Sequence, residues 1–211
     1  MGESIKRIVG PYQDSYSPNG IIGEKDACGV GFIANIKGVE SNWILKQSLK
    51  GLNCMEHRGG CGGDSDSGDG AGILCSIPWG YLEEKINLKN TQEFNRGLGM
   101  VFMPNKKEKI EICKSICDEE AEKLKVNKTS WRTVPVNNEI LGPLAKANAP
   151  FICQWILYID KKDHKDVERL LFQLRKRIEK KIRETFKNDV GDCEFYFASL
   201  SSQTVVYKGM V

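Results

Sequence analysis

The sequence has little of what would assign a function directly. It contains only two histidines, His57 and His164, and its eight cysteines include no Cys-x-x-Cys pair, which disfavours a zinc or iron–sulfur site. No apolar run approaches the ~20 residues that span a bilayer. The net charge of +3, from 31 basic and 28 acidic residues, is too small to favour nucleic acid or an anionic membrane as a partner.

The first residues also lack the apolar centre of a secretory signal, so we expect a cytoplasmic protein with reduced thiols. Cys113 and Cys117 share one face of an expected helix, which favours core packing over ligation. At 211 residues with 40% hydrophobic residues, the chain can bury one substantial core. It is a single domain or part of a larger one.

Cys28 stands at the boundary between a polar leader and an apolar stretch. We expect a buried strand over Gly29–Ala34 that begins at this cysteine. A structural thiol usually lies inside an apolar run, whereas Cys28 has small Ala27 and Gly29 beside it. We predict a nucleophile released by cleavage after Ala27, because a new terminal amine, with a pKa near ~8, can take the thiol proton. The alternative is an inert core cysteine.

A second motif, His57-Arg58-Gly59-Gly60, precedes a glycine-dense loop that runs into an apolar strand. The segments DACGVGF, MEHRGG, GDGAGIL and SLSSQTVVYKGM occur here in this order. Together they resemble the amino-terminal amidotransferase domain of glutamate synthase, of the ferredoxin-dependent or large-subunit type. Gln203 stands where that family is expected to have arginine.

The resemblance implies an α/β (α+β) fold, the four-layer αββα sandwich of N-terminal nucleophile hydrolases, incomplete at the C-terminus. It implies a propeptide over residues 1–27 and, over 28–211, the first part of a class II glutamine amidotransferase domain. Cys28 would hydrolyse L-glutamine through a thioester, and Arg58 would orient Cys28. The alternative for Arg58 is an ion pair with an aspartate of the loop, Asp64, Asp66 or Asp69.

In the family, the released ammonia reaches a distant site where 2-oxoglutarate is converted to glutamate. That site uses FMN, an iron–sulfur cluster, and ferredoxin or a pyridine-nucleotide-dependent small subunit; we expect none of these cofactor sites in this segment. The family also occurs in the plastid stroma of photosynthetic eukaryotes. The later motifs that bind the glutamine carboxylate and form the oxyanion hole, HSRF-like and HNGE-like, are not found.

We therefore expect the 211-residue chain alone to be inactive. Two alternatives remain open: an active glutaminase-type fragment or split subunit completed by another chain, and a truncated non-catalytic fragment that at most associates with a partner through a sheet edge.

Apolar periodicity predicts alternating helices and strands along the rest of the chain. The expected helices are Asn42–Cys54, capped by Ser41 or Asn42, Trp79–Ile86, Glu108–Lys125 with Ile112 on its buried side, and Asp163–Phe186. The expected strands are Gly72–Ile77, Gly97–Met103, Trp131–Val136 at an edge, Phe151–Ile159, Glu194–Leu200 and Thr204–Lys208, with a loop over Leu141–Pro150.

Overall fold

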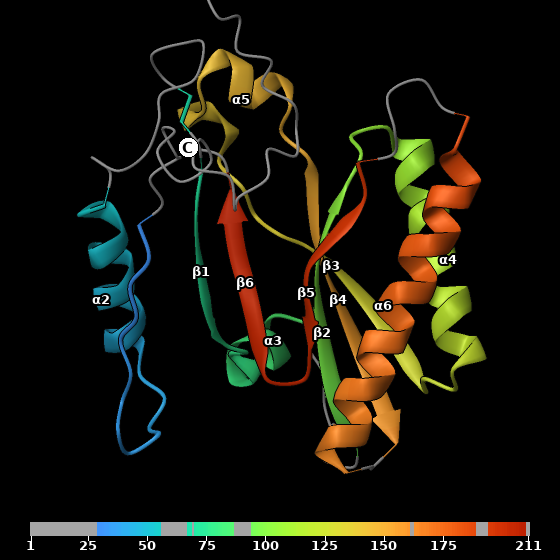
Figure 1. Ribbon diagram of the computed structural model, residues 1–211, viewed down its shortest axis with the longest axis horizontal. Helices are drawn as coiled ribbons and strands as arrows, with labels where there is room; N and C mark the ends of the chain where they lie inside the picture. The colour runs from blue at the N-terminus through green and yellow to red at the C-terminus, as the bar shows by residue number, and fades with distance from the viewer. Residues whose placement is uncertain are drawn as a thin grey trace, which may run out of the picture.

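The computed structural model describes residues 29–55, 67–68, 70–86, 94–160, 163–188 and 194–209. Four layers follow one another across the molecule (Figure 1): a helix, a two-stranded sheet, a four-stranded sheet and a pair of helices. The four-layer αββα arrangement expected from the sequence is confirmed. The helices are α2 (Asn42–Asn53), α3 (Trp79–Lys85), α4 (Lys107–Lys123), α5 (Pro143–Ala147) and α6 (His164–Phe186), with a 3-10 turn at Asn138–Ile140; the strands are β1 (Ala71–Ser76), β2 (Phe94–Met103), β3 (Lys128–Thr133), β4 (Phe151–Asp160), β5 (Tyr196–Ser201) and β6 (Thr204–Gly209).

All the strand pairs are antiparallel. The larger sheet has the order β3-β4-β2-β5, and β1 pairs with β6 in the smaller one. The long central pair β2–β4 sets the register, with Leu98 opposite Ile156. β3 lies at the edge of its sheet, as the sequence predicted.

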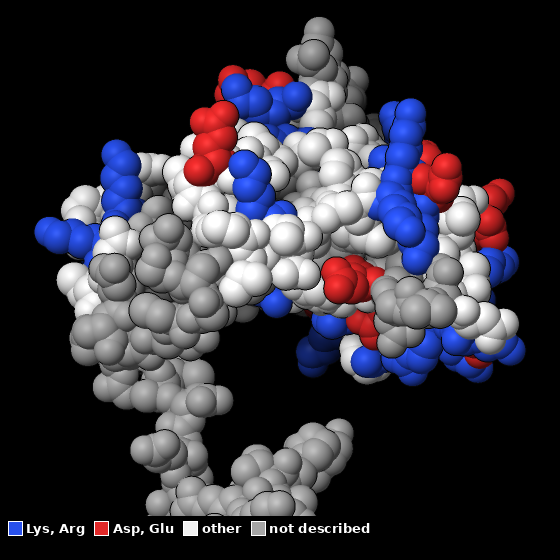
Figure 2. All heavy atoms as spheres, turned by 90° about the horizontal axis from the view of Figure 1, so that it is seen from above, with Lys and Arg blue, Asp and Glu red and all other residues white. Residues whose placement is uncertain are grey.

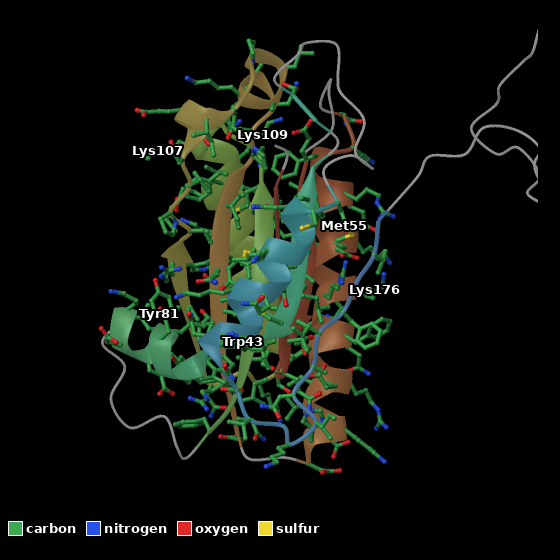
Figure 3. All side chains as sticks on the ribbon, turned by 90° about the vertical axis from the view of Figure 1, so that its left-hand side faces the viewer. Trp43, Met55, Tyr81, Lys107, Lys109 and Lys176 are labelled. Atoms are coloured by element: carbon green, nitrogen blue, oxygen red, sulfur yellow. The ribbon has the colours of Figure 1, made fainter. Side chains whose placement is uncertain are left out.

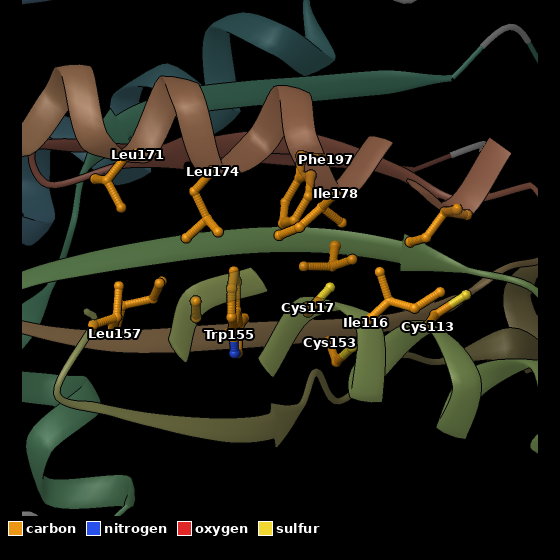
Figure 4. Packing of buried hydrophobic residues seen from close by; sticks show 14 of the residues in the cluster. Cys113, Ile116, Cys117, Cys153, Trp155, Leu157, Leu171, Leu174, Ile178 and Phe197 are labelled. Carbon is orange, nitrogen blue, oxygen red and sulfur yellow. The ribbon is translucent and has the colours of Figure 1, made fainter. Parts of the chain in front are cut away.

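The larger sheet buries both of its faces, because side chains of a strand alternate between them. Leu98, Met100 and Phe102 of β2 pack towards the β1–β6 sheet. Val101 and Met103 pack towards α4 and α6, and this second cluster, which includes Trp155, is shown in Figure 4. A continuously apolar strand such as β4 is what a sheet covered on both sides requires.

In α4 and α6, which cover the outer face of the larger sheet, most of the apolar residues predicted to be buried are buried. α6 starts where the Asp163 carboxylate accepts a hydrogen bond from the His164 amide at 2.8 Å, and its apolar stripe is buried at every turn. Cys113 and Cys117 of α4 lie in the core, as expected. The prediction that Ile112 lies on the buried side of α4 is wrong, because Ile112 is 43% exposed. It lies outside the face that carries Cys113 and Ile116.

The expected strand over Gly29–Ala34 is wrong. Residues 29–35 make no strand pairing, and Val30 and Phe32 are 92% and 98% exposed. A strand needs a neighbour to satisfy its backbone groups, and in the described part of the chain β1 pairs only with β6. The apolar pattern is present, but nothing described here pairs with it.

Other elements also differ from the sequence prediction. The strand expected over Gly97–Met103 starts three residues earlier, at Phe94. The strand expected over Trp131–Val136 starts and ends three residues earlier, at Lys128–Thr133. The segment expected to be a loop, Leu141–Pro150, contains the short helix α5. Pro143 occupies the first turn of α5, where its missing N–H has no partner to lose.

Charges of both signs are interspersed on the face shown in Figure 2. None of the helices in the described ranges has the length and apolar composition that crossing a bilayer requires.

Glu120 of α4 forms the main ionic link to α6. It is only 4% exposed, accepts from Lys123 Nζ at 2.6 Å and Arg177 Nε at 2.8 Å, and has Lys181 Nζ at 3.7 Å. The hydrogen bond from Lys123, followed by that from Arg177, lowers the pKa of Glu120 against the opposing effect of desolvation.

We expect this link to give a stability that depends on pH. Because the pKa of Glu120 is lowered in the folded state, its contribution is full above the ordinary value of 4.5 and is lost as the pH falls through the folded value. Glu120→Gln should reduce the free energy of unfolding at pH 7, and this difference from the wild type should shrink in urea titrations below about pH 4.5. Glu122→Gln, at an exposed position of the same helix, is the control; equal pH profiles for all three proteins would contradict the prediction.

Candidate functional site

Cys28 and Arg58, the two predicted site residues, lie outside the described residues, as do Asp64, Asp66 and Asp69. Their neighbours in sequence are described. Gly29 follows Cys28, and Met55 precedes Arg58 by three residues. The structure therefore describes only the segments that flank the two predicted site residues.

These segments meet. A Cβ atom built on Gly29 would lie 2.8 Å from Met55 Sδ and 3.3 Å from Met55 Cβ. Met55 lies at the C-terminal end of α2 (Figure 3). Two chain segments that are separated by the whole of α2 in sequence are thus in van der Waals contact.

One end of the sandwich gathers the other sequence motifs. The end of α2, the start of β1 and the end of β6 lie at the same end, next to α5 (Figure 1). The glycine-rich motif leads into β1, and the closing SLSSQTVVYKGM motif forms β5 and β6. Described segments that flank three of the motifs thus lie near one end of the sandwich.

Ser67, in the described end of the glycine-rich motif, forms a hydrogen bond to α5. The sequence did not single out this residue. Ser67 is 4% exposed, and its Oγ accepts a hydrogen bond from the Ala145 amide of α5 at 3.1 Å. Gly70 has φ +92°, a conformation that glycine adopts without the steric cost of a side chain. The Gly142-Pro143 pair was the sequence signal for α5, and it was interpreted as a loop.

A cavity of about 270 Å³ lies between the sheets, beside α2. Its wall is apolar except for Tyr207 and Lys208 of β6. It is lined by Leu49, Leu52, Ala71, Gly72, Ile73, Met100, Val134, Val136, Ile152, Tyr207, Lys208 and Gly209. These side chains shape a pocket but offer little to bind the charged ends of an amino acid.

A chain of one buried and two half-buried polar side chains lies next to the cavity. Arg132 Nη1 donates to Gln154 Oε1 at 2.7 Å, and Gln154 Nε2 donates to the Tyr207 hydroxyl at 3.0 Å. Burial is the main cause that raises the pKa of Tyr207, so the phenol stays protonated near neutral pH. The chain Arg132–Gln154–Tyr207 fixes one wall of the cavity, and sequence reasoning did not find it because its members are on three different strands.

A polar cleft of about 410 Å³ at the opposite end contains a serine and a histidine. Ser202 Oγ lies 3.3 Å from His164 Nε2 and donates to Glu168 Oε1 at 2.6 Å. In a hydrolytic triad the carboxylate orients the histidine, whereas Glu168 accepts from Ser201 Oγ and from the Ser202 amide and hydroxyl. Glu168 thus holds the β5–β6 turn, and the cleft does not have the geometry of a serine hydrolase.

The five described cysteines are free thiols. Burial raises the pKa of Cys117 well above its ordinary value and that of Cys153 to about 12, and Cys153 Sγ lies 3.7 Å from Met103 Sδ. Cys117 and Cys153 are therefore inert core thiols. The described residues contain no group of three or more His, Cys, Asp or Glu that could hold a metal ion.

Comparison with known proteins gives a single answer. A family model described as "Glutamine amidotransferases class-II" matches residues 28–211. The chain is 41% identical over 205 residues to the chloroplastic ferredoxin-dependent glutamate synthase of Oryza sativa subsp. japonica, covering 95% of this chain and 12% of that protein.

Similar identity is found to relatives in other lineages. The chain is 41% identical over 195 residues to ferredoxin-dependent glutamate synthase 2 of Synechocystis sp., covering 90% of this chain and 12% of that protein. It is 39% identical over 214 residues to the ferredoxin-dependent glutamate synthase of Pyropia yezoensis, covering the whole chain and 14% of that protein. The chain thus spans a small fraction of the length of these relatives. With the family model matching all but the first 27 of its 211 residues, the chain belongs to the class II glutamine amidotransferases.

Proposed function

We propose that this chain supplies the nucleophile-bearing part of the glutaminase half of a glutamate synthase. Cys28, freed as the N-terminal residue by removal of residues 1–27, attacks the side-chain amide carbon of L-glutamine. The C–N bond breaks, ammonia leaves with a proton from the catalytic residue, and a thioester forms at Cys28. Water then hydrolyses the thioester to L-glutamate and the free thiol.

The observation that carries the proposal is the contact between the residue that follows Cys28 and the end of the described segment that precedes Arg58. Gly29 contacts Met55, and the start of β1 and the end of β6 lie at the same end of the sandwich. Because covalent geometry limits how far Cys28 is from Gly29 and Arg58 from Met55, this contact supports a common site for Cys28 and Arg58. The family match from residue 28 onward supports a mature chain that starts at the cysteine.

Arg58 has the role of orienting Cys28. A guanidinium has five donors in a fixed fork, which suits it to hold the backbone of the nucleophile, and its positive charge favours the thiolate. The groups that bind the glutamine carboxylate and the oxyanion are supplied from outside this chain. The apolar cavity beside α2, with only Tyr207 and Lys208 as polar lining, agrees with such a division.

The rest of the proposed enzyme delivers ammonia to 2-oxoglutarate. Reduced ferredoxin is the proposed electron donor, because the relatives at 39–42% identity are named ferredoxin-dependent. FMN and an iron–sulfur cluster would lie in that remainder, in the cytoplasm or in a plastid stroma. The runner-up is a non-catalytic fragment that associates with a partner chain through its exposed apolar residues, such as Val30 and Phe32.

Replacing Arg58 tests the assignment in the complete synthase. Arg58→Ala should lower glutamine-dependent glutamate synthesis by about a hundredfold or more, because the nucleophile loses its orientation. Synthesis from added ammonia bypasses the amidotransferase site and should stay within about twofold of the wild type. Equal losses in both assays, together with lower thermal stability, would instead favour an ion pair that shapes the loop.

A further inference from the structure

The contact between Gly29 and Met55 involves more than the tip of a flexible side chain. A Cβ on Gly29 would lie 2.8 Å from Met55 Sδ, 3.3 Å from Met55 Cβ and 3.4 Å from Met55 Cγ. The sulfur could move aside by rotation of the side chain, but the Met55 Cβ is fixed by the backbone. A larger residue at position 29 therefore requires the Met55 side chain to rotate and either the end of α2 or the Gly29 backbone to shift by a few tenths of an ångström.

The end of α2 is itself held in place. The Met55 amide donates to the Leu52 carbonyl at 2.9 Å, and the Cys54 amide donates to the Lys50 carbonyl at 3.2 Å. At the other end of the helix, Ser41 Oγ accepts from the Trp43 amide at 3.1 Å, which caps the helix. Met55 thus lies one residue beyond the C-cap Cys54 of a capped helix and presents its side chain to Gly29.

Gly31 provides a contrast within the same segment. A Cβ on Gly31 would meet nothing within 4 Å, although Gly31 is only two residues away. The restriction therefore belongs to position 29, where Met55 is, and is not a general property of the segment.

We propose that Met55 is a positioning residue for the glutaminase reaction and that position 29 must be glycine to receive it. This inference rests on the proposed roles of Cys28 and Arg58. Met55 sets the spacing between the segment that begins at Cys28 and the segment that carries Arg58. A methyl group at position 29 must displace Met55 or its own backbone, and because Gly29 is bonded directly to Cys28 the shift is passed to the proposed nucleophile. A misplacement of about 1 Å at a reacting group can cost about a hundredfold in rate.

The test is a bump-and-hole series in the complete synthase that contains this chain: Gly29→Ala, Met55→Ala, the double variant, Met55→Leu, and Gly31→Ala as the matched control. Activity is expressed per molecule whose intact mass shows Cys28 at the N-terminus, so a change in processing is not counted as a change in chemistry. Glutamine-dependent synthesis, ammonia-dependent synthesis and the KM for glutamine are measured for each.

Gly29→Ala should lower the glutamine-dependent kcat by about a hundredfold, with KM for glutamine within about threefold, because Met55 does not contact the substrate. Met55→Ala should lower the glutamine-dependent kcat by about tenfold. The double variant should recover at least about tenfold over Gly29→Ala, since the added methyl occupies space that the Met55 side chain has left. Met55→Leu should keep most activity, Gly31→Ala nearly all of it, and ammonia-dependent synthesis should be unchanged throughout.

Two results would overturn the inference: Gly29→Ala as active as Gly31→Ala, or a double variant no more active than Gly29→Ala. Failure of the proposed function is recognised separately, because Cys28→Ala would then retain glutamine-dependent synthesis. If Cys28→Ala is inactive while Gly29→Ala is fully active, the nucleophile assignment stands and the positioning role of Met55 is wrong.

Discussion

Replacing Cys28 by alanine should abolish glutamine-dependent glutamate synthesis, lowering it by more than about a thousandfold, while ammonia-dependent synthesis in the same complete enzyme persists. The sulfur forms the bond to the substrate carbon, and no other group can take its place. Cys28→Ser should be almost as inactive, because a hydroxyl has a far higher pKa than a thiol and the terminal amine is too weak a base to ionise it. Both syntheses are measured as glutamate formed from 2-oxoglutarate.

Covalent labelling gives an independent measure of the same nucleophile. An electrophilic glutamine analogue should add one equivalent to Cys28 in the complete enzyme, located by peptide mapping. The thiols of Cys117 and Cys153 should not be labelled, because burial raises their pKa values and leaves them almost no solvent-exposed surface. Cys54 is exposed, so Cys54→Ser is the control and should leave the labelling stoichiometry unchanged.

The 211-residue chain alone should label slowly, since the residues that bind the glutamine carboxylate are not found in it. Rapid, stoichiometric labelling of Cys28 in the short chain would show that it has a working pocket and would refute the expectation that it is inactive. Labelling of Cys54 in place of Cys28 would reject the nucleophile assignment.

The largest effect on stability is expected at Asp118. Its carboxylate accepts hydrogen bonds from the indoles of two stacked tryptophans, Trp131 Nε1 at 3.0 Å and Trp155 Nε1 at 3.1 Å, and from Thr129 Oγ1 at 2.7 Å. The tryptophan rings are stacked with centroids 5.3 Å apart, and Trp155 is completely buried. One carboxylate thus satisfies three donors where α4 meets the sheet.

Asp118→Leu should lower the free energy of unfolding by about 3 kcal/mol, because the indole N–H groups of the buried Trp155 and the half-buried Trp131 lose the carboxylate acceptor that they share. Asp118→Asn, which keeps one acceptor oxygen, should cost about half as much. The measurement is urea unfolding followed by tryptophan fluorescence, which reports directly on Trp131 and Trp155.

The matched control is Glu122→Leu, an acidic-to-leucine change at an exposed position of the same helix. It should change the free energy of unfolding by less than about 0.5 kcal/mol. A cost at Asp118 as small as at Glu122 would show that water satisfies the indoles and that the carboxylate contributes little.

Much of this architecture could be predicted from the sequence because it depends on local periodicity. The stripe of α6 repeats at the helical spacing, so its buried face was evident, and its start at Asp163 follows from a side chain that can cap a helix. The unbroken apolar run of β4 likewise indicated a strand covered on both faces. The motifs around Cys28 and Arg58 were sufficient to indicate the family, which the family model confirms.

What the sequence could not determine depends on partners that are distant along the chain. Gly29–Ala34 has the composition of a strand but does not form one, because a strand exists only with a neighbour to receive its hydrogen bonds. α5 was missed because five residues carry almost no periodic signal. The polar set Arg132–Gln154–Tyr207 comes from three strands whose adjacency is a matter of topology.

The sequence by itself determined the family, because its motifs are sets of residue types at fixed spacings that are evident along the chain. The tertiary structure alone decided which distant segments come into contact. It placed Gly29 against Met55, a pairing across the length of α2 that no spacing rule gives. The reason is physical: reactivity belongs to residue types and is written locally, whereas the spacing between reactive groups is set by packing and exists only in the folded chain.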